Sequence, residues 1–182
     1  MNINQHWLTD ITQTPSPNYD ERPDPTDISL LVIHCISLPP GEFDNFYIDQ
    51  LFCNQLDPNK HPYFEEIHQL TVSAHILIKR TGKVVQYVPF DKRAWHAGKS
   101  EYEGRERCND FSIGIELEGT EHVEYTDQQY LQLTAVIQTL LKSYPELSAQ
   151  RITGHSDIAP GRKNDPGASF DWQRLFCLLN ES

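Results

Sequence analysis

The sequence predicts one domain of the α/β class over residues 1–182. Apolar, β-branched runs of strand length share the chain with segments whose apolar residues recur at helical spacing. A chain of 182 residues can bury one hydrophobic core. Because neither a linker nor an internal repeat divides the sequence, we expect a single domain.

The first predicted strand covers residues 28–36 and carries His34 near its carboxyl end. Residues 10–27 precede it and hold four prolines among polar side chains, which predicts an extended arm packed over the body rather than a strand. Since α/β sheets place ligands at the carboxyl ends of their strands, His34 is a candidate site residue. A lone histidine, however, is more often a hydrogen-bonded core residue.

Residues 37–70 form a long connection directly after this strand. It begins with Pro-Pro-Gly, includes a candidate short helix at residues 45–52, and continues through a loop at residues 57–62. Connections of this length beside a site are often lids, so we expect residues 37–70 to close over it. The alternative is a well-packed surface loop.

Two further strand patterns follow. Residues 74–79 and 84–88 flank an Arg-Thr-Gly turn, which predicts a β-hairpin. Residues 111–117 alternate apolar with small or polar side chains, so Glu116 is expected on the face opposite the apolar one. Glu118 has the same parity but is expected to lie past the strand end.

The C-terminal part predicts two helices around a short strand. A capping box begins at Thr126 and predicts a scaffold helix that ends at Tyr144-Pro145. Residues 151–153 predict a short strand that leads into His155, and residues 170–179 predict a closing helix.

The loop at residues 154–167, rich in proline and glycine, brings His155, Lys163 and Asp165 together. Lys163 and Asp165 are two apart in an extended segment, so they should project to the same side. Imidazole and carboxylate are zinc ligands, and His34 offers a third from a rigid strand. We therefore expect His34, His155 and Asp165 to bind one Zn²⁺ with a fourth position open, which is typical of catalytic rather than structural zinc.

Two further side chains have the chemistry of catalytic groups. Glu116 is a candidate for general acid-base catalysis, because it lies in an otherwise apolar strand and burial raises a carboxylate pKa. Lys163 is the candidate for stabilising the oxyanion. The alternatives are a solvated carboxylate at Glu116 and a salt bridge from Lys163 to Asp165.

The order of these motifs resembles the AmpD-type N-acetylmuramoyl-L-alanine amidases, a zinc amidase family related to peptidoglycan recognition proteins. The resemblance implies a central mixed β-sheet flanked by helices and assigns the same three zinc ligands. It also implies hydrolysis, by a zinc-bound water, of the amide between the lactyl group of 1,6-anhydro-N-acetylmuramic acid and L-alanine during peptidoglycan recycling. The resemblance rests on six sequence blocks, at residues 33–41, 72–75, 85–89, 94–98, 112–119 and 154–167.

The resemblance also suggests substrate contacts. Trp95 and His96, in Trp-His-Ala-Gly, are similar to the family's substrate-pocket motif, where an aromatic face packs on a sugar and an imidazole hydrogen-bonds. His75, in Ser-Ala-His, is a third candidate, although a core tryptophan and a hydrogen-bonded strand histidine are the plain alternatives. Cys35 and Thr71 depart from the Asn and Arg common in the family, which affects substrate binding rather than metal chemistry.

Composition and charge restrict the classes of partner and the cell compartment that we expect for this chain. The formal net charge of −11 disfavours nucleic acid and an anionic wall and favours a small soluble muropeptide. The first residues lack the pattern of a signal peptide, and no apolar run approaches the ~20 residues that span a bilayer, so we expect a cytoplasmic protein without membrane contact. Its four cysteines are then free thiols. No obligate protein partner is evident.

Two other functions remain open on the sequence: an amidase acting on intact cell wall, and a non-catalytic module that binds peptidoglycan fragments. The negative charge and the lack of an export signal argue against the first. The presence of all three ligands with Glu116 and Lys163 argues against the second.

Overall fold

A mixed six-stranded β-sheet forms the centre of the computed structural model, which describes residues 1–180. The strand order is β12-β5-β11-β6-β7-β3, with all neighbours parallel except β6 and β7. The predicted α/β class and mixed sheet are confirmed. The strands are β3 (Thr12–Gln13), β5 (Leu30–Ile36), β6 (Ile76–Ile78), β7 (Val84–Gln86), β11 (Ser112–Glu118) and β12 (Ile152–Gly154).

The parallel pair β5 and β11 fixes the position of the site. Its register pairs Ser112 with Leu30 and Glu116 with His34, so two candidate catalytic side chains start from adjacent backbone positions. All seven residues of β11 are buried, as expected for a central parallel strand covered on both faces. The apolar face of β11 packs in the main core with α3, while Ser112 and Gly114 on the other face contact His96.

Glu118 is a correction to the sequence-based expectation. It lies within β11 rather than past its end, and it is fully buried. Its carboxylate accepts hydrogen bonds from the backbone N–H groups of Asp44 (3.0 Å) and Arg80 (2.9 Å). Parallel pairing with β5 extends the strand by this residue, which pattern alone could not show.

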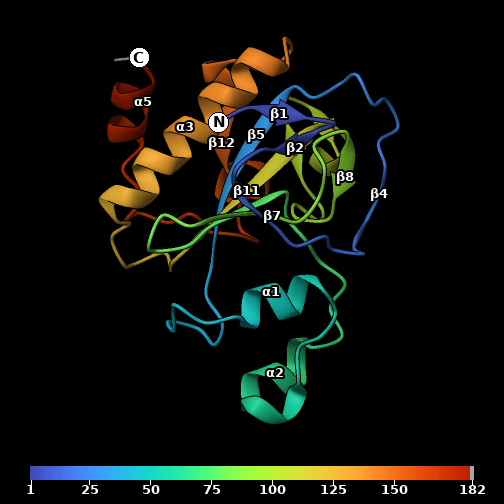
Figure 1. The fold of residues 1–182 in the computed structure, drawn as a ribbon, viewed down its shortest axis with the longest axis vertical. Coiled ribbons are helices and arrows are strands. Elements are labelled where there is room, and N and C mark those ends of the chain that lie inside the picture. Colours follow the sequence, from blue (N-terminus) through green and yellow to red (C-terminus); the bar gives the residue numbers. More distant parts are fainter. Residues whose placement is uncertain (181–182) are drawn as a thin grey trace.

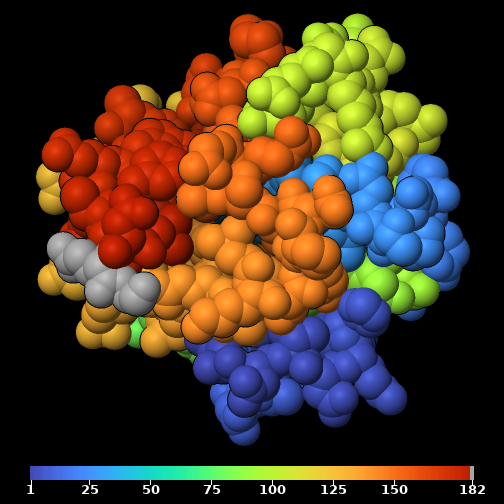
Figure 2. Space-filling view, turned by 90° about the horizontal axis from the view of Figure 1, so that it is seen from above, coloured from blue at the N-terminus to red at the C-terminus, as the bar shows by residue number. Residues whose placement is uncertain are grey.

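Helices α3 (Asp127–Ser143) and α5 (Trp172–Asn180) pack together on one side of the sheet (Figure 1). The predicted capping box is confirmed: the Thr126 hydroxyl accepts from the Gln129 N–H, and the Gln129 side chain accepts from the Thr126 N–H. Helix α3 ends before Tyr144, as expected. In Figure 2 the C-terminal helix (red) lies beside the orange surface of α3 and the residues that follow it.

Residues 37–70 form a separate layer beyond the carboxyl end of β5, at the lower end of Figure 1. The predicted short helix is confirmed as α1 (Tyr47–Phe52), but the predicted loop at residues 57–62 contains a 3-10 turn and the first residue of α2. Asp57 and His61 cap these two turns through their side chains, each followed by a proline. The added elements are η1 (Pro58–Lys60) and α2 (Pro62–Ile67).

The prediction for the N-terminal arm is partly wrong, because the arm contributes two short strands. Residues 12–13 form β3 at the sheet edge, and β4 (Tyr19–Glu21) pairs with β8 (Lys92–Ala94). The prolines flank these pairs instead of occupying them, so the ladder hydrogen bonds survive. The predicted hairpin is confirmed by the β6–β7 pairing.

The other elements are short: β1 (Ile3–Asn4), β2 (Trp7–Leu8), β9 (Glu101–Tyr102), β10 (Arg105–Glu106), η2 (Cys108–Asp110), η3 (Ala149–Arg151) and α4 (His155–Ile158). Among all helices of residues 1–180, none is long and apolar enough to cross a membrane.

Candidate metal centre

Three side chains from different segments converge at the carboxyl edge of β5 and β12. His34 lies on β5, His155 follows β12 as the first residue of α4, and Asp165 lies in the next loop. The two Nδ1 atoms are 2.9 Å apart, and each is 3.1 Å from Asp165 Oδ2. Among residues 1–180 they form the one group of three metal-ligating side chains close enough to share an ion.

The geometry of these donors fits Zn²⁺. Bonds of about 2.0–2.1 Å in a tetrahedron place ligand atoms about 3.3 Å apart, close to the separations found here. His155 Nε2 lies 3.1 Å from the carbonyl oxygen of Ala97, so Nε2 carries the proton and Nδ1 presents its lone pair to the centre. Two imidazole nitrogens and a carboxylate oxygen directed at one point are suited to a cation.

The protonation states also favour metal binding. Burial lowers the pKa of His34 to about 4, against the opposing hydrogen bond with Asp165. Burial acts to raise the pKa of Asp165, but hydrogen bonds with His155 and His34 outweigh it and lower that pKa below its ordinary value. At neutral pH the centre therefore offers a neutral imidazole at His34 and an ionised carboxylate.

Glu116 lies beside His34 in the β5–β11 register and points into the same cavity. It is 9% exposed, and its buried Oε2 has no hydrogen-bond partner. Burial raises its pKa well above the ordinary value, the charge of Asp165 raises it further, and Lys163 lowers it. A buried carboxylate with a free oxygen is suited to hold a proton or a water molecule.

Lys163 lines the same cavity from an exposed loop position. Within residues 1–180 no salt bridge joins it to Asp165, whose Oδ2 contacts the two imidazoles instead. The ammonium group is thus available to a ligand in the cavity.

The cavity has a volume of about 370 Å³ and contains all three metal-ligating side chains with Glu116 and Lys163. An adjoining cavity of about 300 Å³ shares Trp95, His96, His155 and Lys163 with it. Much of the wall comes from the segment predicted to act as a lid, through Ser37, Leu38, Pro40, Leu51, Phe52, Tyr63, Ile67 and Leu70.

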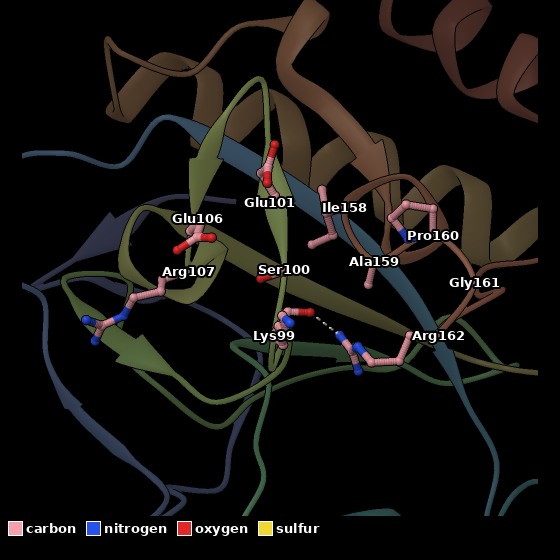
Figure 3. Close-up of a pocket in the computed structure, with 10 residues that line it drawn as sticks. All are labelled: Lys99, Ser100, Glu101, Glu106, Arg107, Ile158, Ala159, Pro160, Gly161 and Arg162. Atoms are coloured by element: carbon pink, nitrogen blue, oxygen red, sulfur yellow. Dashed lines mark hydrogen bonds between the residues drawn. The ribbon is translucent and has the colours of Figure 1, made fainter.

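Another cavity, of about 500 Å³, lies elsewhere (Figure 3). It opens between residues 99–107 and the loop at residues 158–162, and it contains none of the predicted site residues. Arg162 separates it from the metal centre by donating hydrogen bonds to the carbonyl oxygens of Ala97 (2.6 Å) and Lys99 (2.7 Å). The cavity of about 370 Å³, and not this one, contains the three metal-ligating side chains together with Glu116 and Lys163.

Trp95 is placed where a substrate could contact it. It lines both cavities at the metal centre, and its indole N–H donates to Asp20 Oδ1 (3.2 Å), which orients the ring. Its backbone N–H donates to the Ser73 hydroxyl.

His96 and His75 lie differently from the expectation of substrate hydrogen bonds. His96 lines the cavities, but its Nδ1 is 2.8 Å from His34 Nε2 and its Nε2 is 3.1 Å from Ser112 Oγ, so both ring nitrogens are engaged within the protein. His75 is fully buried and lines neither cavity. Its Nδ1 accepts from the Gly114 N–H, and its Nε2 lies 3.0 Å from the carbonyl oxygen of Lys92.

Arg22 lies in the proline-rich arm, where no local sequence pattern marks it as a buried residue near the site. It is 4% exposed, and burial lowers its pKa to about 10. Its guanidinium group ties the arm to the start of β11 by donating to the carbonyl oxygens of Phe90, Asn109, Asp110 and Ser112.

The two departures from the family pattern both face the site. Cys35 lines the cavity of the metal centre and Thr71 lines the adjoining one. Burial raises the pKa of Cys35 to about 12, so it remains a thiol. Cys35 is not among the metal-ligating side chains, as the alternation of a strand predicts.

Comparison with known proteins defines the class. The chain belongs to the N-acetylmuramoyl-L-alanine amidase family, whose model matches residues 24–168. It is 60% identical over 182 residues to the 1,6-anhydro-N-acetylmuramyl-L-alanine amidase AmpD of Citrobacter freundii, covering 100% of this chain and 97% of that relative. A crystal structure of a selenomethionine AmpD derivative superposes with a TM-score of 0.96 at 60% identity, covering 98% of this chain and 99% of the other.

A more distant solved structure contains a substrate. The N-acetylmuramyl-L-alanine amidase AmiD from E. coli, in complex with anhydro-N-acetylmuramic acid-L-Ala-D-gamma-Glu-L-Lys, superposes with a TM-score of 0.64 at 29% identity. The match covers 84% of this chain and 57% of AmiD.

Proposed function

We propose that residues 1–182 act as one zinc-dependent amidase domain that cleaves 1,6-anhydro-N-acetylmuramyl peptides. The bond broken is the amide between the lactyl group of the sugar and L-alanine of the stem peptide. The observation that carries this proposal is the convergence of His34, His155 and Asp165 beside the unpaired carboxylate of Glu116. The 60% identity to AmpD along the whole chain and the substrate bound to AmiD support the choice of bond.

The side chains that would hold one Zn²⁺ are His34, His155 and Asp165, through Nδ1, Nδ1 and Oδ2, because the spacing of these atoms suits the ion. Such an ion would polarise the scissile carbonyl and make water a stronger nucleophile at neutral pH. A set of three protein ligands, rather than four, is typical of a catalytic centre.

Glu116 moves the proton. Its free Oε2 accepts a proton from the attacking water and returns it to the nitrogen of L-alanine, because an amide anion is too poor a leaving group to depart unprotonated. Lys163, which lines the same cavity, donates to the oxygen of the tetrahedral intermediate, a contribution of about 3–4 kcal/mol in oxyanion sites. The products are the free anhydro sugar acid and the peptide.

Trp95 is the residue we assign to the sugar, because its ring lines the cavity and is oriented by Asp20. A cavity of about 370 Å³ suits a small soluble fragment better than a polymer. The net charge of −11 also disfavours an anionic wall or nucleic acid as a partner. Four free cysteines suit a reducing compartment, so we place the reaction in cytoplasmic peptidoglycan recycling, without a membrane or an obligate protein partner.

The test combines substrate and metal. Purified protein, chelator-stripped protein and zinc-reloaded protein are each incubated with anhydro-N-acetylmuramic acid-L-Ala-D-gamma-Glu-L-Lys and, separately, with isolated cell-wall sacculi. We expect mass spectrometry to show peptide release from the soluble substrate only with zinc, at one ion per chain. Faster release from sacculi would favour the wall-hydrolase alternative, and binding without release would favour the non-catalytic module.

A further inference from the structure

We infer that His96 and Ala97 act together as a brace that orients both histidine ligands, with His96 as a positioning residue rather than a substrate contact. The inference rests on the proposed zinc site. It concerns the ring nitrogens that face away from the metal, which lie against two consecutive residues of the Trp-His-Ala-Gly segment.

The distances define the brace. His34 Nε2 lies 2.8 Å from His96 Nδ1, and His155 Nε2 lies 3.1 Å from the carbonyl oxygen of Ala97. The rings of His34 and His96 meet edge to face, with centroids 4.9 Å apart. One short segment therefore holds both imidazoles by the nitrogen opposite the metal.

The hydrogen-bond directions are consistent along the whole chain of contacts. For His34 Nδ1 to bind metal it must be unprotonated, so its proton lies on Nε2 and is donated to His96 Nδ1. His96 then carries its own proton on Nε2 and donates it to Ser112 Oγ, 3.1 Å away. The Ser112 hydroxyl, which can accept as well as donate, is a partner for this tautomer of His96, whose free Nδ1 accepts from His34 Nε2.

Gly114 makes room for this arrangement. A Cβ at Gly114 would lie 2.4 Å from Cγ of His96, closer than real atoms approach. A glycine in the middle of a buried strand is destabilising, because it has no side chain to pack and loses more conformational entropy on folding than other residues. The space that Gly114 leaves for the His96 ring is a physical reason for a glycine at this position. On the backbone side, the N–H groups of His96 and Ala97 donate to Asn109 Oδ1, at 3.2 and 2.8 Å.

Partners of this kind usually change metal affinity by 10–100-fold, because they fix the ligand ring and raise its basicity. Carboxylates and carbonyl groups fill this role most often. Here a neutral imidazole fills it for His34 and a carbonyl group for His155. The motif that resembles a substrate pocket thus acts on the metal through its second residue.

The test measures zinc affinity by chelator competition in the full chain, with folding checked by thermal unfolding. His96→Ala should weaken zinc binding by about 10–100-fold. His96→Asn keeps an acceptor near the position of Nδ1 and should recover most of the affinity, whereas His96→Gln places its amide near Nε2 and should not. The matched control is His122→Ala, an exposed histidine, which should bind zinc as the unchanged chain does.

Two further readouts separate a positioning role from a structural one. Ring ¹⁵N NMR of His34 should report a proton on Nε2 in the unchanged chain and a mixture of tautomers in His96→Ala. If His96→Ala fails to fold, Ser112→Ala breaks the same chain of hydrogen bonds one step further out and should weaken zinc binding in the same direction.

The outcomes distinguish this inference from the proposed function. Equal zinc affinity in the unchanged chain and in folded His96→Ala, or in Ser112→Ala when that variant alone folds, overturns the brace and leaves the amidase proposal standing. Equal loss in His96→Ala and His96→Asn overturns the acceptor role. An unchanged chain that binds no zinc overturns both proposals.

Discussion

At the scale of single residues, Glu116 and Glu118 show how position on one strand separates chemistry from structure. They lie two apart on the same face of β11, and both are buried. Glu118 has its oxygens hydrogen-bonded to two backbone N–H groups, whereas Oε2 of Glu116 has no partner. The Glu118 carboxylate is thus engaged in structural hydrogen bonds, whereas Glu116 keeps one oxygen available to a ligand.

Glu116→Gln should retain zinc and lose turnover by about 10²-fold or more, because the amide cannot accept the proton from water. Single-turnover kinetics and metal analysis measure the two effects. Glu118→Gln is the matched control: it should lower the melting temperature while changing kcat little, since it removes a hydrogen-bond acceptor away from the cavity. Near-normal turnover in Glu116→Gln would move the acid-base role to another group.

Lys163→Met should also keep zinc, and kcat should fall while KM changes little, because the lost interaction forms only in the transition state. The exposed position of Lys163 predicts an unchanged melting temperature. Steady-state kinetics on the soluble muropeptide measure both constants. A change confined to KM would assign Lys163 to substrate binding instead.

At the scale of elements, the start of α3 is a junction between helix and sheet. The Thr126 hydroxyl accepts from the Gln129 N–H (3.1 Å) and donates to the carbonyl oxygen of Arg80 (2.8 Å). The Gln129 amide donates to the carbonyl oxygens of Ile78 and Glu118 at the ends of two strands. The capping box therefore anchors the helix to the strand that carries Glu116.

Thr126→Ala should lower the free energy of unfolding by about 1–2 kcal/mol, the usual effect of losing an N-cap side chain. Zinc content should not change, because the cap lies outside the cavity. Urea denaturation measures the first quantity and metal analysis the second. Thr126→Ser, which keeps the hydroxyl, is the control and should recover most of the loss.

The segment at residues 37–70 is the second element with a functional prediction. It supplies much of the cavity wall, and its Leu51 and Phe52 belong to an apolar cluster that includes Leu77 of β6 and Val85 of β7. We expect hydrogen exchange in this segment to slow when product is bound, because closure over the metal centre excludes water. Exchange as slow as that of β11, and unchanged by product, would show a static wall.

At the scale of the whole molecule, the buried histidines set the response to acid. The pKa of His34 is lowered to about 4 and that of His75 to about 3, mainly by burial, so between these values and about 6.5 the unfolded chain binds more protons than the folded one. Stability of the zinc-free protein should therefore fall as pH drops from about 6.5 towards 4. Below about 4, protonation of Asp165 adds to the loss, because its folded pKa is also depressed.

Activity should fall on the same acid side, since protons compete with zinc for His34 and His155. Added zinc should shift the acid limb of the rate profile to lower pH. Thermal unfolding of the zinc-free protein and rate profiles at two zinc concentrations measure the two effects. An acid limb that stays in place while metal remains bound would assign it to Glu116 or to the attacking water.

Local sequence determined the parts of this protein that depend on neighbours along the chain. Apolar runs predicted β5 and β11, the capping box predicted α3, and the glycine turn predicted the β6–β7 hairpin, because each depends on contacts within a few residues. The order of motifs led to the amidase family, and the comparisons confirm it.

Only the tertiary structure decided the pairings between distant segments. It placed β3 and β4 against partners about 73 residues away, put Glu118 inside a strand, and brought His96 Nδ1 to within 2.8 Å of His34 Nε2. His34 and His155 are 121 residues apart, and no local pattern encodes which ring nitrogen of either faces the other. Side-chain partners of this kind follow from sheet register and burial, which exist only once the whole chain has packed.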